Sequence, residues 1–179
     1  METVQSLRWK DVVRQQYDYS CGTGSISNLL KFLGKPFESE KGIIAAYAKL
    51  YGDEKVEQAQ KEGFSLLDLK RMLAVLGYKS EGVRYEKGTL PDEFHPMIVY
   101  LVVREYRHFS VFAGIEANQV VLLDSARGKI RVTIERFLHE WDGTALLPDP
   151  TLTATVSLPD ERMNRTVAQD AIRRCAVGK

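Results

Sequence analysis

The chain has 179 residues, of which 44% are apolar, 27% charged and 9% aromatic. These proportions are those of one ordinary globular domain and exclude a disordered chain, and the length is sufficient for a hydrophobic core without metals or disulfides. The 25 Lys and Arg residues nearly balance the 24 Asp and Glu residues, and a formal net charge of +1 argues against a nucleic-acid-binding protein with a basic stripe.

Membrane, disulfide and metal classes are also disfavoured. The longest apolar run, residues 97–103, is far shorter than the ~20 residues of a membrane helix and predicts a buried strand. Two cysteines, Cys21 and Cys175, are too few for a disulfide framework or a tetrahedral zinc site, so we expect no metal and no cofactor. One disulfide agrees with the count, but nothing in the sequence places the two thiols close together.

The first part of the chain has the spacing of amphipathic helices. Residues 20–33 carry apolar side chains three and four positions apart, and Gly34 and Pro36 then end the predicted helix. Its expected inward residues are Ile26, Leu29, Leu30 and Leu33. A second helix is predicted over residues 40–51. Its expected inward residues are Ile43, Ile44, Tyr47, Leu50 and Tyr51.

The polar residues 53–62 either extend this helix or form an exposed connection. After them, Ser65 and Asp68 have the spacing of a capping box, which predicts that another helix begins there and ends at Gly77. Its expected inward residues are Leu66, Leu69, Leu73 and Leu76.

Beyond Gly77 the pattern becomes that of extended strands. Six strands are predicted, over residues 78–84, 97–103, 108–114, 119–124, 129–133 and 144–147. Residues 116–119 form a hairpin turn, and a short helix over residues 134–141 interrupts the later strands. Helices followed by an antiparallel sheet are typical of the α+β class. We therefore expect one domain over residues 1–147, with N-terminal helices packed on an antiparallel β-sheet.

Residues 148–179 form a predicted C-terminal tail. Pro159 is a good helix start, and apolar residues then follow at every fourth position as far as Cys175. This helix either packs on the domain or is detached from it.

Cys21 is a candidate nucleophile. It lies in the first turn of the helix predicted over residues 20–33, where unpaired backbone N–H groups and the helix dipole favour an anion. Such a position lowers the pKa of a thiol from about 8.5 towards ~3.5–7.5, and the thiolate is the nucleophile. Gly22 and Gly24 are small enough to let a substrate backbone approach. The alternative is a buried structural cysteine.

A cysteine nucleophile needs a base and a group that orients the base. His95 and His139 are expected to be solvated or packing residues. His108 opens a predicted strand, and the hairpin brings it near Asp124 at the end of the partner strand. The two are therefore a candidate base and orienting carboxylate, although residues 124–128 also fit an ordinary turn.

Acyl chemistry also needs hydrogen-bond donors for the developing oxyanion. Gln15, six residues before Cys21, can reach back to the helix start beside the backbone N–H of Cys21. Gln16 is a rival on spacing alone.

Together these residues resemble the bacteriocin-processing, double-glycine-leader cysteine peptidases over about residues 8–147. The motifs that carry the resemblance are Gln15, Cys21-Gly22, His108-Phe109-Ser110-Val111, Asp124-Ser125-Ala126-Arg127-Gly128 and Gly63-Phe64-Ser65-Leu66-Leu67-Asp68-Leu69-Lys70. The last of these is most similar to the stand-alone periplasmic peptidases of functional-amyloid (Fap) secretion systems.

The resemblance implies a papain-like fold and assigns each site residue a role. Cys21 would be the nucleophile, His108 the general base and acid, Asp124 the orienting carboxylate and Gln15 the oxyanion donor. It also implies cleavage after a Gly-Gly pair in a peptide or protein substrate, and secretion-system components as partners. Neither a nucleic-acid partner nor a membrane span is expected. Residues 1–10 lack the apolar segment of a signal peptide, so the location is either periplasmic with the signal removed, or cytoplasmic.

The chain departs from this family at three positions. Alanines usually follow the Cys-Gly pair where this chain has Thr23 and Gly24, and a proline usually follows the aspartate where it has Ser125. Two other functions stay open. One is a catalytically silent module that binds a leader peptide or amyloid precursor, and the other is a cysteine acyltransferase or transglutaminase-like enzyme.

Overall fold

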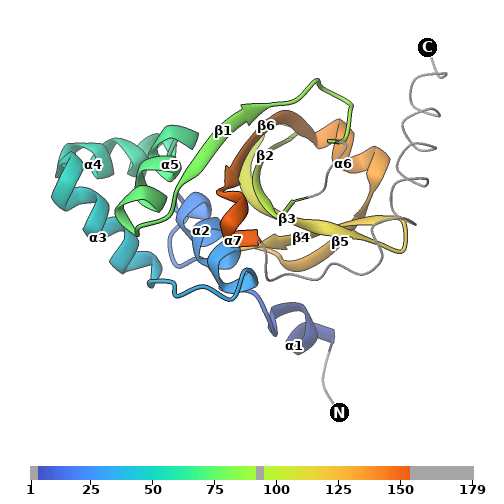
Figure 1. Cartoon of the computed structure of the whole chain (residues 1–179), viewed down its shortest axis with the longest axis horizontal. Helices are drawn as coiled ribbons and strands as arrows, with labels where there is room; N and C mark the ends of the chain where they lie inside the picture. The colour runs from blue at the N-terminus through green and yellow to red at the C-terminus, as the bar shows by residue number, and fades with distance from the viewer. Residues whose placement is uncertain (1–3, 92–94, 154–179) are drawn as a thin grey trace.

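The computed structural model describes residues 4–91 and 95–153. The helices are α1 (Val4–Trp9), α2 (Cys21–Phe32), α3 (Glu40–Tyr51), α4 (Asp53–Glu62), α5 (Leu66–Val75), α6 (Ile134–Glu140) and α7 (Pro150–Thr153). The strands are β1 (Ser80–Arg84), β2 (Met97–Val103), β3 (Tyr106–Glu116), β4 (Gln119–Asp124), β5 (Gly128–Thr133) and β6 (Trp141–Pro148). Helices α3, α4 and α5 lie to one side of a curled sheet, and α6 lies at the other side (Figure 1).

Local hydrogen bonds explain where several helices begin. The Ser39 side chain accepts from the backbone N–H of Gly42 at the start of α3. At the start of α5, Ser65 and Asp68 form both hydrogen bonds of the predicted capping box. Each contact satisfies a backbone donor that has no partner inside the helix. The polar residues 53–62 form the separate helix α4, which begins after Gly52 at φ 94°.

The predicted helix α3 has the expected bounds, but two of the residues predicted to be inward, Leu50 and Tyr51, are not. Ile43 and Tyr47 are buried, whereas the side chain of Leu50 is 66% exposed, and Tyr51 is also exposed. The apolar period marks the face of a helix that packs. It does not say how far along the axis the neighbouring elements extend, and they do not cover the last turn of α3.

The six strands form one antiparallel sheet in the order β1-β6-β2-β3-β4-β5. The predicted hairpin joins β3 to β4 through Ala117 and Asn118, which both have positive φ. Strand β3 begins two residues earlier than predicted because β2 and β3 pair as far as Val103 and Tyr106. This hairpin is what aligns the ends of β3 and β4.

Two hydrophobic clusters pack on the two faces of the sheet. Val111 of β3 and Leu123 of β4 join helices α2, α3 and α5 in the first cluster. Phe112 and Leu122, one residue along each strand, join α6 in the second. Because side chains alternate between the faces of a strand, the strands buried on both sides read as continuous apolar runs.

The predicted C-terminal tail starts at residue 148, and the structure describes only its residues 148–153. Strand β6 extends to Pro148, and Leu152 of α7 packs against the first cluster. The predicted tail helix and Cys175 lie outside the described residues, so the proposed division at residue 148 stays a prediction. Among residues 4–91 and 95–153, no helix is long and apolar enough to cross a membrane.

Candidate active site

Cys21 is the first residue of α2, as predicted. Ser20 precedes the helix, and its hydroxyl donates to the carbonyl of Tyr17 at 2.8 Å instead of capping the helix. Ser20 therefore leaves the first N–H groups of α2 without a side-chain cap at the end of the helix where Cys21 lies. The thiol is free and half-buried.

The ring of His108 lies between this thiol and a buried carboxylate. Its Nε2 is 3.0 Å from Oδ2 of Asp124, and both side chains are fully buried, at 1% and 0% exposure. Burial by itself lowers the pKa of the His108 imidazole. Hydrogen bonds with Asp124 and Cys21, and the negative charge of both groups, outweigh burial and raise this pKa to about 9. The ring therefore keeps its positive charge at neutral pH beside the sulfur.

Asp124 is held in one orientation from several sides. Its Oδ1 accepts from the backbone N–H groups of Ala126 at 3.0 Å and Arg127 at 2.9 Å. Its Oδ2 accepts from Nε and Nη2 of Arg127 at 2.9 and 2.7 Å. Burial raises the pKa of the Asp124 carboxyl, but His108 and Arg127 outweigh burial and lower it to about 2. Residues 124–128 are thus both a turn and part of the site.

Arg127 and Tyr106 were not predicted to take part. The Tyr106 ring stacks on the His108 ring with centroids 5.5 Å apart, and its hydroxyl is 3.4 Å from Nδ1 of His108. Residues two positions apart on a strand share a face, and this rule could have identified Tyr106. Arg127 could have been identified only from the turn that brings its guanidinium back to Asp124.

The structure distinguishes the two candidate glutamines. The Gln15 carboxamide accepts at Oε1 from the hydroxyl of Ser125 at 2.9 Å and donates from Nε2 to the carbonyl of Tyr17 at 2.9 Å. It therefore lies beside the residue that follows Asp124. Gln16 is exposed, and its backbone N–H donates to Glu40. The geometry favours Gln15.

Two glycines near Cys21 make close contacts with other elements of the fold. Both Gly22 and Gly24 are buried. A Cβ atom at Gly22 would lie 2.6 Å from Cδ2 of Leu69, and one at Gly24 would lie 2.6 Å from Cβ of Ser125. Non-bonded carbon atoms do not approach so closely. These glycines let α5 and the turn after β4 pack against α2.

The two other histidines lie on other elements than the site residues. His139 is exposed on α6, and His95 is half-buried just before β2. No hydrogen bond of either to Cys21 or Asp124 is present among the described residues.

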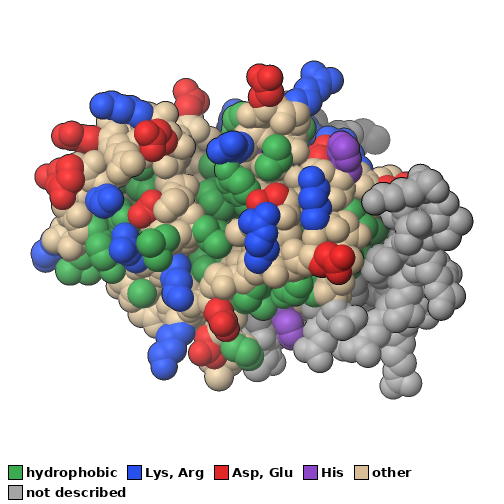
Figure 2. Space-filling view, turned by 90° about the horizontal axis from the view of Figure 1, so that it is seen from above, with side chains coloured by type: hydrophobic (Ala, Val, Ile, Leu, Met, Phe, Trp, Pro, Cys, Tyr) green, Lys and Arg blue, Asp and Glu red, His purple; other side chains and the backbone are tan. Residues whose placement is uncertain are grey.

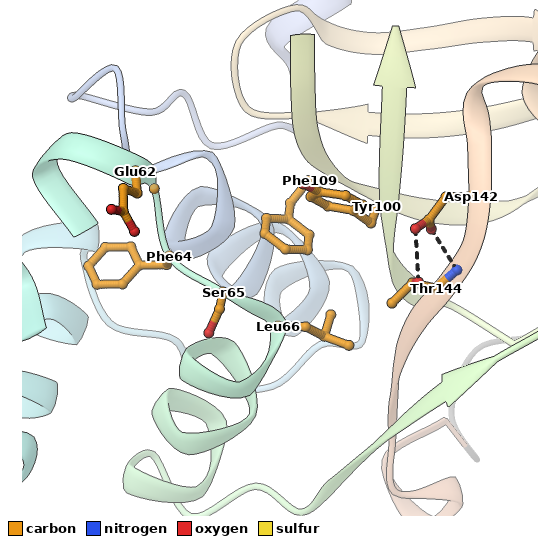
Figure 3. Close-up of a pocket in the computed structure, with 9 residues that line it drawn as sticks. Glu62, Phe64, Ser65, Leu66, Tyr100, Phe109, Asp142 and Thr144 are labelled. Atoms are coloured by element: carbon orange, nitrogen blue, oxygen red, sulfur yellow. Dashed lines mark hydrogen bonds between the residues drawn. The ribbon is translucent and has the colours of Figure 1, made fainter. Parts of the chain in front are cut away.

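A pocket of about 330 Å³ lies between the connection of α4 to α5 and strands β2, β3 and β6 (Figure 3). Residues 62–66, at the connection of α4 to α5, form one wall; Tyr100 and Phe109 of β2 and β3 form another, and Asp142 and Thr144 of β6 close the third side. Phe109 follows His108 in β3, and the ring of Phe64 lies 6.0 Å from that of Tyr19, two residues before Cys21. The pocket thus borders the segments of chain that carry Cys21 and His108, and its lining consists of residues other than Cys21, His108 and Asp124.

Residues 9–153 match the family described as the Peptidase C39 family. The chain belongs to this family. It is accordingly a cysteine peptidase by family, as the resemblance implied.

Two curated relatives of the chain are named as functional amyloid proteases. The chain is 31% identical over 144 residues to the "Probable functional amyloid protease FapD" of Pseudomonas aeruginosa, with 80% of this chain and 62% of that protein covered. It is 28% identical over 176 residues to the protein of the same name from Pseudomonas fluorescens, with 90% of this chain and 76% of that protein covered. The chain thus spans less than two thirds of the length of the P. aeruginosa relative.

Solved structures of this fold include peptidase domains of transporters. One is a double glycine motif protease from an AMS/PCAT transporter in complex with the leader peptide, with a TM-score of 0.63, 21% identity, and 78% of this chain and 90% of that chain covered. Another is the peptidase domain of Streptococcus ComA, with a TM-score of 0.60 and 23% identity. That match covers 78% of this chain and 97% of that chain. These matches confirm the predicted α+β, papain-like peptidase fold.

Proposed function

We propose that this C39 peptidase cleaves a peptide bond after a Gly-Gly pair in a leader or exported protein. The observation that carries the proposal is the arrangement in which the buried His108 ring is hydrogen-bonded to Asp124 and lies close enough to Cys21 for that group to raise its pKa. The names of relatives support the substrate class, because they include a double glycine motif protease and a functional amyloid protease. By the same likeness, the chain supports secretion of an amyloid or peptide and acts in the periplasm.

The reaction follows from the protonation states of the site. The Cys21 sulfur attacks the scissile carbonyl carbon, and the C–N bond breaks as imidazolium His108 gives its proton to the leaving amine. His108, now neutral, takes a proton from a water molecule, and the oxygen of that water attacks the thioester. The C–S bond breaks, which releases the carboxylic acid and the Cys21 thiolate, and the charged His108 ring is restored beside the sulfur. Asp124 stabilises the charged ring in both steps. Gln15 and the backbone N–H of Cys21 donate to the oxyanion.

Glycines suit the approach to this thiol. Cys21 is half-buried, and the ring of Tyr106 stacks on the ring of His108, the base of the site. A substrate backbone without Cβ atoms on either side of the scissile bond can enter such a space with the least steric cost.

The pocket beside the site fits a further part of the substrate. Its aromatic and aliphatic walls, Phe64, Leu66, Tyr100 and Phe109, suit one apolar side chain of the leader.

Lys and Arg residues are interspersed with Asp and Glu on the face seen in Figure 2. The face therefore has no broad basic stripe of the kind that binds nucleic acid.

The test uses a fluorogenic leader peptide with one Gly-Gly pair and a matched peptide with Ala-Ala. The wild-type chain should cleave the first and spare the second, with products identified by mass spectrometry. Cys21→Ala should lose turnover while keeping its circular-dichroism spectrum and melting temperature. Cleavage of the Gly-Gly peptide by Cys21→Ala at the wild-type rate would refute the assignment of the nucleophile.

The same experiment separates the alternatives. A wild-type chain that binds the Gly-Gly peptide without cleaving it is a silent binding module. An added primary amine that appears in the product mass identifies an acyltransferase. Iodoacetamide gives a further check, because a catalytic Cys21 should be alkylated much faster than an ordinary exposed thiol.

A further inference from the structure

Ser125 connects two parts of the candidate site that are far apart in the sequence. It is fully buried and directly follows Asp124. Its hydroxyl donates to Oε1 of Gln15 at 2.9 Å, and its carbonyl accepts from the backbone N–H of Gln15 at 2.9 Å. The strand end that carries Asp124 and the loop that carries Gln15 are therefore joined by two hydrogen bonds through one residue.

Gly24 provides the space that Ser125 occupies. A Cβ atom at position 24 would lie 2.6 Å from Cβ and 2.9 Å from Oγ of Ser125, and 3.5 Å from Cβ of Gln15. Any larger residue would push the hydroxyl away from the carboxamide, because non-bonded atoms repel strongly at these distances. Two of the departures from the family, Gly24 and Ser125, are thus complementary to each other in space.

The contacts of Gln15 define which end of its carboxamide is the donor. The carbonyl of Tyr17 can only accept, so Nε2 must lie on that side, at 2.9 Å. The Ser125 hydroxyl donates to Oε1 on the other side. One N–H of the amide group remains for a ligand. A carboxamide turned by 180° would instead present its oxygen to a developing negative charge, which is repulsive.

The backbone on the other side of Gln15 is also held. The N–H of Gln16 donates to Oε2 of Glu40 at 2.7 Å, and Oγ1 of Thr23, which donates to the carbonyl of Ser20, lies 3.3 Å from Oε1 of the same carboxylate. Glu40 is buried. With the loop held in this way, the remaining freedom of Gln15 is rotation of its side chain, and Ser125 restricts that rotation.

We propose that Ser125 is a positioning residue of the oxyanion hole. Its hydroxyl sets the Gln15 carboxamide so that the remaining N–H of Nε2 is available to the substrate oxyanion, and Gly24 makes room for the Ser125 side chain. This inference rests on the proposed peptidase function, and it names a residue that acts through Gln15 and does not touch the substrate.

The first test is a double-mutant cycle on cleavage of the Gly-Gly peptide. Gln15→Ala should lower kcat by roughly 10²–10³-fold, as loss of one oxyanion donor does. Ser125→Ala should lower kcat by about tenfold with KM unchanged, and Gln15→Ala/Ser125→Ala should be no slower than Gln15→Ala, because groups that act as a unit are non-additive. A wild-type kcat for Ser125→Ala, or losses that multiply in the double mutant, would overturn the proposal.

A second measurement distinguishes an effect of Ser125 on Gln15 from an effect on its neighbour Asp124. Alkylation of Cys21 by iodoacetamide has no tetrahedral oxyanion, so it depends on His108 and Asp124 but not on Gln15. Ser125→Ala should therefore be alkylated at the wild-type rate. An alkylation rate that falls as much as kcat would show that the substitution acts through Asp124, and the proposal would be wrong.

A third measurement does not depend on activity. In ¹⁵N-labelled protein, Ser125→Ala should shift the side-chain NH₂ signals of Gln15 and speed their exchange with water. Unchanged signals would overturn the positioning role even if the enzyme is active. Conversely, a wild-type chain that cleaves no Gly-Gly peptide refutes the proposed function, while the NMR comparison still decides whether Ser125 orients Gln15.

Discussion

His108 and Asp124 lie sixteen residues apart in the sequence, and their Nε2 and Oδ2 atoms lie 3.0 Å apart in the folded chain. The pair is fully buried. An ion pair removed from water in this way is stable only if further hydrogen bonds satisfy both partners. Asp124 has these bonds from Arg127 and the turn, and His108 has the Cys21 thiol. These contacts therefore hold the positively charged His108 ring beside the Cys21 sulfur.

The pH dependence of cleavage should have an alkaline limb near pH 9. The pKa of His108 is raised to about 9, so the ring keeps the proton needed by the leaving amine below this pH and loses it above. The Asp124 carboxyl, with its pKa lowered to about 2, stays ionised throughout the range and sets neither limb. The measurement is kcat/KM from pH 4 to pH 10. An alkaline limb near pH 6.5, the ordinary pKa of histidine, would contradict the predicted limb near pH 9.

Asp124→Asn should lower kcat by roughly 10²–10⁴-fold, because the orienting carboxylate sets the tautomer and charge of the base. The hydrogen bond and negative charge of Asp124 raise the pKa of His108, so their loss should move the alkaline limb below pH 9. Asp142→Asn is the matched control, since Asp142 accepts from Thr144 beside the pocket. It should leave the limb in place. An equal shift in both variants would remove the special role of Asp124.

Arg127→Ala should raise the pKa of the Asp124 carboxyl and lower the unfolding free energy by about 1 kcal/mol. It removes two charge-assisted hydrogen bonds from a buried carboxylate. Arg131→Ala removes a comparably short ion pair to Glu116, with both side chains exposed. Urea unfolding should therefore show a smaller loss for Arg131→Ala, and only Arg127→Ala should slow alkylation of Cys21. Equal effects of the two variants would mean that Arg127 supports nothing beyond a surface ion pair.

Gly22→Ala should destabilise the protein by roughly 1–3 kcal/mol, although alanine is the better helix former. The new Cβ atom would meet the Leu69 side chain at 2.6 Å, between α2 and α5. At Gly42 of α3 the nearest atom is the end of the exposed Glu38 side chain, at 3.2 Å. Gly42→Ala should therefore leave the melting temperature unchanged or raise it. Melting temperatures that move together would contradict the packing role of Gly22.

Local signals predicted most of the fold. The capping box of Ser65 and Asp68 and the stripe of α2 are contacts between residues three or four positions apart, which short-range geometry determines. The hairpin that brings His108 to Asp124 depends on one turn between two apolar runs. Leu50 was wrongly predicted to be inward, because its exposure depends on where other elements end.

The sequence by itself therefore determined the α+β class, the placement of Cys21 at a helix start and the approach of His108 to Asp124. Only the tertiary structure decided what surrounds them. Ser125 and Gln15 are 110 residues apart, and Gly22 contacts Leu69 of a different helix. Periodicity records which side of an element is buried, whereas the partner of a buried side chain depends on how complete elements pack, and no short segment contains that information.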